Sequence, residues 1–143
     1  MSCFDKLKII TSINYIKNID YNKFKSGFKG GQEIFQYIQT APSSLFIMTN
    51  PQLSELVIEF TSKILKDNFI HLINKDNIHE CFKNINQLNI CTLDIDNIIN
   101  NSELVKCDVA KDIDLQDIYL QDIKGLKNYT NTYLVNQNNR WIL

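Results

Sequence analysis

The stretch that decides the fold is Glu55-Leu56-Val57-Ile58-Glu59-Phe60-Thr61-Ser62-Lys63-Ile64. Leu56, Ile58 and Phe60 alternate with residues that include two glutamates, so one face of an extended segment is apolar. Alternation with a period of two, in a run of β-branched and aromatic residues, is typical of a half-buried strand. The pattern therefore predicts a central strand over residues 55–64.

Three earlier segments have strand-like patterns: Phe4–Thr11, Gln32–Gln39 and Ser44–Thr49. In the first of them, Leu7 and Ile9 are expected to point inward, with Lys6 and Lys8 outward. Short connections favour pairing between strands that are close in the chain. These segments and the central strand therefore predict a meandering antiparallel sheet.

An amphipathic helix is predicted after the central strand, because apolar residues recur at steps of three and four. These residues are Ile78, Cys81, Phe82, Ile85 and Leu88. Asn74 is expected to cap the start of this helix, and Asn89 to end it. A short helix is expected over Asp94–Asn100, and a second amphipathic helix from Asp114 onward.

The remaining segments complete the predicted fold. Glu103–Ile113 is expected to be a strand with Val105 and Cys107 on one face, and Tyr129–Val135 is a further candidate strand. The closing Arg140-Trp141-Ile142-Leu143 fits either a final strand docked on the sheet or an apolar tail. The whole pattern predicts one α+β domain over residues 1–143, mainly antiparallel sheet with two amphipathic helices packed on one face.

Composition is that of a globular protein. The 143 residues are 44% hydrophobic and 22% charged, and they suffice for a core without disulfides or metal. The net charge of −1 gives no strong overall field, but the charges are unevenly placed. Residues 1–31 hold six lysines and two aspartates, whereas residues 94–122 hold eight acidic residues and two lysines.

The basic beginning is the candidate nucleic-acid-binding region, since lysines contact phosphates and tyrosines stack on bases. The candidate residues are Lys6, Lys8, Tyr15, Lys17, Tyr21, Lys23, Lys25 and Lys29. Glycines predict a loop over Ser26–Gly31, which either approaches a phosphate backbone or is an ordinary connection. No phosphate-binding or dinucleotide-binding glycine motif is present. The plainer interpretation is that these lysines are only a solvated face.

The acidic region, residues 94–122, has three interpretations. Its aspartates are helix caps and solvated strand ends, or they gather into a divalent-metal site, or they imitate a phosphate backbone. The first is the simplest, so no metal ligand and no cofactor are predicted. His71 and His79 lack further ligands at a suitable spacing, and no nucleophile with a base beside it is evident. No catalytic residue is therefore predicted.

The four cysteines have neither a C-x-x-C pair nor zinc-type spacing, and Cys81 and Cys107 are expected to fill core space. The start of the chain lacks the apolar region of a signal peptide, and no window is apolar enough for a membrane span. A cytoplasmic location with reduced thiols is predicted, with no membrane partner.

Three stretches resemble the N-terminal part of rolling-circle replication initiator proteins of phages and plasmids, the type related to the filamentous-phage gene II protein. They are Phe4–Ile9, Leu56–Leu65 and Val105–Ile113. Members of that family nick DNA with a tyrosine, helped by a metal on a His-hydrophobic-His motif. This chain has no such motif, and His71-Leu72-Ile73 departs from it at the comparable place. The resemblance therefore implies the scaffold without the nicking chemistry.

These observations lead to a non-catalytic phage or mobile-element protein that binds nucleic acid or a nucleoprotein. The alternative is a small phage-encoded inhibitor of a host defence nuclease, of the anti-CRISPR type, which binds the effector or its guide RNA. A nicking enzyme with an unrecognised site, using Tyr129 or Tyr133, is the third hypothesis. The oligomeric state is not predicted.

Overall fold

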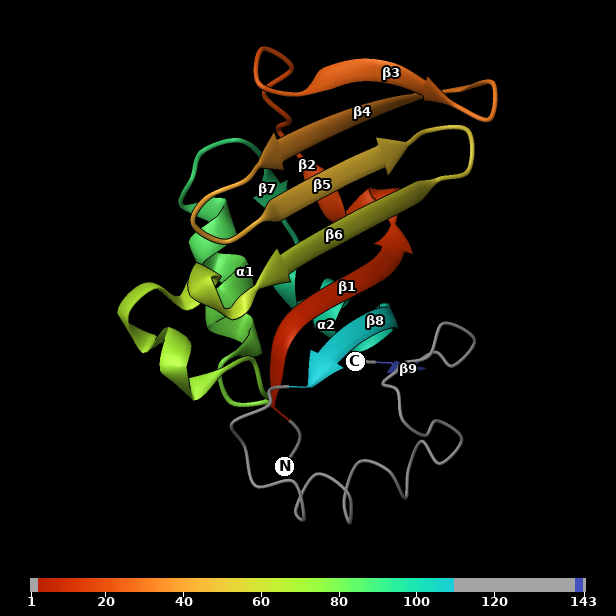
Figure 1. Cartoon of the computed structure of the whole chain (residues 1–143). Helices are drawn as coiled ribbons and strands as arrows, with labels where there is room; N and C mark the ends of the chain where they lie inside the picture. The colour runs from red at the N-terminus through yellow and green to blue at the C-terminus, as the bar shows by residue number, and fades with distance from the viewer. Residues whose placement is uncertain (1–2, 110–140, 143) are drawn as a thin grey trace.

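The computed structural model describes residues 3–109 and 141–142, which form an α+β body built on an antiparallel sheet (Figure 1). The sheet has seven strands in the order β3-β4-β5-β6-β1-β8-β9. Their bounds are β1 Phe4–Ser12, β3 Lys25–Lys29, β4 Gln32–Gln39, β5 Leu45–Asn50, β6 Glu55–Thr61, β8 Glu103–Val109 and β9 Trp141–Ile142. The predicted fold class, a mainly antiparallel sheet with helices on one face, is confirmed.

The central strand is confirmed but is shorter than predicted. Leu56, Ile58 and Phe60 are fully buried, and β6 ends at Thr61, where a 3-10 segment, η2 (Ser62–His71), begins. Ile64 and Leu65 are consecutive and both buried. β6 also buries the consecutive residues Leu56, Val57 and Ile58, on its two faces, so an apolar pattern alone does not mark where this strand ends.

The helices lie on one face of the sheet, together with a small second sheet (Figure 1). They are α1 (Ile78–Asn86) and α2 (Ile95–Asn101), and the small sheet pairs β2 (Ile16–Lys17) with β7 (Thr92–Leu93). The predicted stripe of α1 is confirmed, with Cys81, Phe82 and Ile85 fully buried. Phe82 meets Phe60 of β6 edge to face, with ring centroids 5.6 Å apart. The main core therefore lies between the sheet and these helices.

The predicted helix ends need one correction. The N-cap of α1 is Asn77, and the side chain of the predicted cap, Asn74, holds the turn before it by accepting from the Asp76 and Asn77 amides. Asn89 has φ 59° just beyond the helix, as expected of a stop. Asp94 caps α2 and accepts from the Asn97 amide.

The predicted loop over Ser26–Gly31 is wrong for most of its length. β3 runs to Lys29, and only Gly30 and Gly31 form the turn to β4, with φ of 59° and 81°. Two positive φ values are the requirement of a tight two-residue hairpin, which two glycines meet without a steric cost. The glycines mark a hairpin between two strands.

The far end of the sheet is formed by β8 and β9. Within β8 the register shifts beside Leu104, so Leu104 and Cys107 are the buried residues, and the predicted face through Val105 is wrong. β9 pairs with β8 through Leu104–Trp141, which agrees with a docked final strand. The helix predicted from Asp114, the strand Tyr129–Val135 and the end of Glu103–Ile113 lie outside the described residues.

Candidate nucleic-acid interface

The eight candidate binding residues do not form one surface. Lys6 and Lys8 lie on β1, near the middle of the sheet. The second group lies on and just before the edge strand β3: Tyr21, Lys23, Lys25 and Lys29. The third group, Tyr15 and Lys17, lies on the helix side of the sheet. β4, β5 and β6 separate the first group from the second, a distance of roughly 19 Å at the usual strand spacing.

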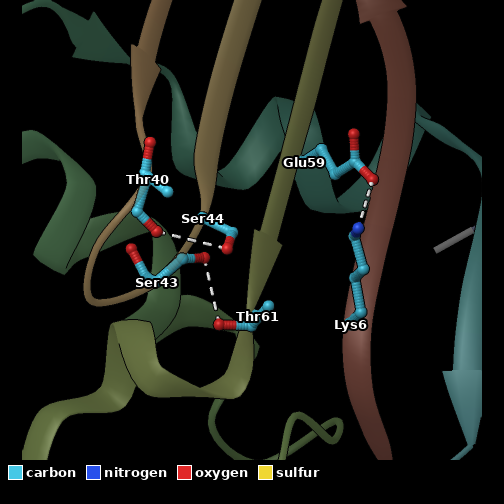
Figure 2. Close-up of polar contacts among 6 residues, drawn as sticks. All are labelled: Lys6, Thr40, Ser43, Ser44, Glu59 and Thr61. Carbon is cyan, nitrogen blue, oxygen red and sulfur yellow. Dashed lines mark hydrogen bonds and ion pairs between the residues drawn. The ribbon is translucent and has the colours of Figure 1, made fainter.

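The lysines of the first group have an acidic neighbour. The Lys6 ammonium lies 3.1 Å from the Glu59 carboxylate on β6, as Figure 2 shows. Glu59 is also the residue directly opposite Lys8 in the β1–β6 register. This glutamate offsets positive charge on the middle of the sheet, so β1 is a poor place for a phosphate.

The third group offers little to a nucleic acid. Tyr15 is half-buried, packs against the core, and its carbonyl accepts from the Asp94 amide at 2.9 Å. Lys17 is exposed on β2, but its strand pairs with β7 beside the helices. A tyrosine that packs against the core has less of its ring available for stacking on a base.

The lysines of β3 differ from those of β1 in their described neighbours. Lys25, Gly27 and Lys29 lie opposite Gln36, Ile34 and Gln32 of β4, so they share the sheet face away from the helices. Among the described residues, neither Lys25 nor Lys29 forms an ion pair, and both are exposed. A Cβ built on Gly27 would meet nothing within 4 Å, so the space between the lysines is open.

Aromatic rings accompany these lysines. The ring of Phe28 is on the opposite face of β3 and is 77% exposed, and Tyr21, in the turn before β3, is 60% exposed. Tyr21 contacts Phe35 of β4 edge to face, with centroids 5.3 Å apart. Phe28 is not among the candidates that the sequence indicates, because the glycines around it predict a loop. The signal in the sequence is that Phe28 falls on the opposite face of an extended segment from Lys25 and Lys29.

We call this set the β3 edge surface, and it consists of Tyr21, Lys23, Lys25, Phe28 and Lys29. Residues 21–39 contain three lysines and one acidic residue, Glu33, which lies opposite Phe28. In the part of the sheet that the structure describes, β3 is an edge strand and pairs only with β4. The surface is thus basic, partly aromatic and accessible along one strand edge.

The other candidate groups lie apart from this surface. Asp94 caps α2, Asp108 is on β8, and the exposed Asp96 lies 3.9 Å from His79. The rest of the acidic region, residues 110–122, lies outside the described residues. Within residues 3–109 and 141–142, no three His, Cys, Asp or Glu side chains come close enough to hold a metal ion. His71 is exposed at the end of η2.

The thiols of Cys81 and Cys91 in the core stay protonated at neutral pH. Burial raises the pKa of the Cys81 thiol to about 12, with a smaller contribution from the charge of Glu80. Burial alone raises the pKa of Cys91 to about 12. Because the thiolate is the reactive form, both side chains act as small core hydrophobes at neutral pH. Cys107 is also buried, as predicted.

Comparison with known proteins gave no match to a family model, to a curated protein or to a solved structure. None of the helices in the described part of the chain is long and apolar enough to cross a membrane.

Proposed function

We propose that this chain is a non-catalytic nucleic-acid-binding protein of a phage or other mobile element, working in the cytoplasm, and that the β3 edge surface makes the contact. The observation that carries the proposal is a pair of exposed lysines, Lys25 and Lys29, which form no ion pair with any described residue. They lie on the edge strand of the described sheet, beside two exposed aromatic rings. Lysines without a carboxylate neighbour keep their full attraction for phosphate.

The position of the resembling stretches supports a scaffold like that of the replication initiators. Phe4–Ile9, Leu56–Leu65 and Val105–Ile113 contribute to β1, β6 and β8, which are three adjacent strands. In this proposal the shared part is the middle of the sheet. The binding surface lies on β3, at the edge away from β8.

The proposal is tested by measuring the anisotropy of fluorescently labelled 20-nucleotide DNA and RNA between 50 and 200 mM salt. Lys25→Ala/Lys29→Ala is expected to weaken binding about tenfold or more, and to lower the salt slope by about 0.7 per lysine for a single strand. The matched control is Lys63→Ala/Lys75→Ala, which removes the same charge from exposed positions outside the sheet. Equal losses in both variants, or no salt-dependent binding by the native protein, would contradict the proposal.

A protein contact is the second candidate, and one observation favours it. Phe69 and Ile70 of η2 are 42% and 67% exposed, and the ends of their segment are fixed. The Ile64 carbonyl accepts from the buried Asn84 side chain at 2.9 Å, and Ile73 exchanges backbone hydrogen bonds with Phe4. Exposed apolar side chains on a segment that is attached at both ends are suited to a pocket on a protein.

This second candidate is the small inhibitor of a defence nuclease. It predicts that the purified protein slows DNA cleavage by a guide-loaded effector nuclease. Phe69→Ser/Ile70→Ser should then abolish the inhibition, while Lys25→Ala/Lys29→Ala leaves it intact. Inhibition that depends on the β3 lysines would assign the contact to guide RNA, and unchanged cleavage would reject the candidate.

A further inference from the structure

The geometry points to single-stranded nucleic acid as the ligand of the β3 edge surface, with bases stacked on Phe28 and Tyr21 and phosphates beside Lys25 and Lys29. This inference rests on the proposed nucleic-acid binding and narrows it to one kind of ligand. Three features of the strand edge carry it: the row of rings, the separation of charge from rings, and the open edge itself.

The rings form a row across the hairpin. Phe28 lies opposite Glu33 on β4, so it is the diagonal neighbour of Phe35 on the same face. Phe35 in turn contacts the ring of Tyr21. Phe35 is half-buried, whereas Tyr21 and Phe28 are largely exposed. Two exposed rings on one face of the hairpin offer a stacking platform, which accepts any base because every base has a π face.

The charges and the rings lie on opposite faces of one strand. Lys25 and Lys29 project from the face away from the helices, and Phe28 projects from the other. In a nucleotide, the phosphate and the base project from different sides of the sugar. A strand that runs along the β3 edge can therefore place phosphates beside the lysines while its bases reach the rings. The space above Gly27 lets the backbone come close.

A duplex does not suit this arrangement as well. Its bases are already stacked within the helix, so they cannot cover Phe28 or Tyr21 without leaving the stack. Reading of a duplex groove needs side chains that reach base edges, whereas the long side chains of β3 are lysines, which mainly contact phosphate. The exposed rings are used only by a ligand whose bases are unstacked.

Glu33 is an acidic residue of the hairpin, and its charge is expected to oppose binding of nucleic acid. It is exposed and lies directly across from Phe28, within the row of rings. Its carboxylate repels the phosphates of a bound strand. Removal of this charge is expected to strengthen binding, whereas most surface changes weaken it or leave it unchanged.

The test measures binding of labelled dT20, rU20 and a 20-base-pair duplex to the native protein, Phe28→Leu, Tyr21→Leu and Glu33→Gln. Leucine keeps the apolar character and removes the π face. Phe28→Leu is expected to weaken binding of the single strands about 5- to 150-fold, with an unchanged salt slope. Glu33→Gln is expected to tighten it. Phe69→Leu, which changes an exposed ring of η2, is the matched control and should have no effect.

The outcomes separate this inference from the proposed function. If duplex binds as tightly as the single strands, the inference fails and the proposed function stands. The same holds if Phe28→Leu binds the single strands like the native protein while Lys25→Ala/Lys29→Ala binds them more weakly. If none of the three probes binds in a salt-dependent way, both fail. Thermal unfolding checks that each variant is folded, which is expected because Phe28 contributes little buried surface.

Discussion

Thr11 and Thr61 differ in whether their side-chain hydroxyl makes a hydrogen bond. The Thr61 hydroxyl donates to the Ser43 carbonyl at 3.0 Å (Figure 2). The Thr11 hydroxyl is buried with no partner among the described residues, as is that of Ser102. A buried polar group that makes no hydrogen bond loses its contact with water and gains nothing in return.

Thr11→Val is therefore expected to raise the free energy of unfolding by about 1 kcal/mol, because it removes an unsatisfied hydroxyl from an isosteric side chain. Thr61→Val, the same chemical change, is expected to lower it by about 0.5–1 kcal/mol, because the Ser43 carbonyl loses the hydroxyl donor and keeps the Thr61 amide. Urea unfolding at pH 7 measures both. A loss of stability in Thr11→Val equal to that in Thr61→Val would mean that the Thr11 hydroxyl has a partner.

The buried thiols predict how stability depends on alkaline pH. Cys81 and Cys91 have a pKa of about 12 in the folded chain, against an ordinary value of 9.0. Between these values the unfolded chain loses thiol protons that the folded chain keeps, so the stability is fully present below pH 9 and falls as the pH rises. Each thiol contributes up to about 1.4 kcal/mol per pH unit in this window.

Cys81→Ala/Cys91→Ala is accordingly expected to flatten the decline in unfolding free energy between pH 9 and 11. The measurement is urea unfolding at several pH values. Ionisation of lysines and tyrosines affects the native and variant chains alike, so the difference in slope isolates the thiols. Parallel curves for the two chains would be evidence against buried, protonated thiols.

Among the elements, η2 contains the most unusual backbone. Lys66, in its interior, has φ 59° and ψ −122°, and Leu72, just after it, has φ 59° and ψ 171°. Residues other than glycine rarely adopt such backbone angles, and each instance costs about 1–3 kcal/mol. The contacts of Ile64 and Ile73 at the two ends hold the segment in this conformation.

Lys66→Gly is expected to stabilise the protein by up to about 1 kcal/mol, since glycine relieves the strain and the exposed lysine side chain forms no ion pair with a described residue. Lys63→Gly, an exposed position of η2 without this backbone, is expected to destabilise it by about 0.5–1 kcal/mol. Thermal unfolding compares the two. A lower midpoint for Lys66→Gly than for Lys63→Gly would disprove the strain.

The elements also show which parts of the fold can be predicted from sequence. Alternation predicted β1, β4, β5 and β6, because each signal lies within one segment. β3 was not predicted, because its glycines are typical of a loop. The register shift beside Leu104 was not predicted either, because it depends on pairing with β1. A glycine pair that closes a hairpin differs from a glycine-rich loop only through the strands on either side.

The proposed binding surface was only partly predictable for a similar reason. The lysine-rich beginning was visible in the sequence, but strand order decides which lysines are neighbours. β1 was placed by topology between β6 and β8, which put Lys6 beside Glu59 and far from Lys25. No single stretch of sequence encodes such long-range pairings. Composition could therefore identify the lysine-rich segment, but it could not show that its lysines lie on separate parts of the sheet.

For the whole molecule, stability depends on the contact between the sheet and α1. Phe82 is fully buried and meets Phe60 of the central strand. Phe82→Ala is expected to lower the free energy of unfolding by about 3–5 kcal/mol, a large part of the stability of a typical domain. Phe28→Ala, at the exposed edge, should change it by less than about 0.5 kcal/mol. Urea midpoints measure both, and similar shifts in the two variants would show that Phe82 does not anchor the core.

The position of β1 has a consequence during synthesis. β1 precedes every other strand in the chain, yet its neighbours in the sheet are β6 and β8. On the ribosome, β3 to β6 can pair in the order in which they emerge. The apolar side chains of Leu7 and Ile9 on β1 have no partner strand until β6 has left the exit tunnel. The apolar row of β1 is therefore uncovered and prone to aggregation until β6 is available to pair with it.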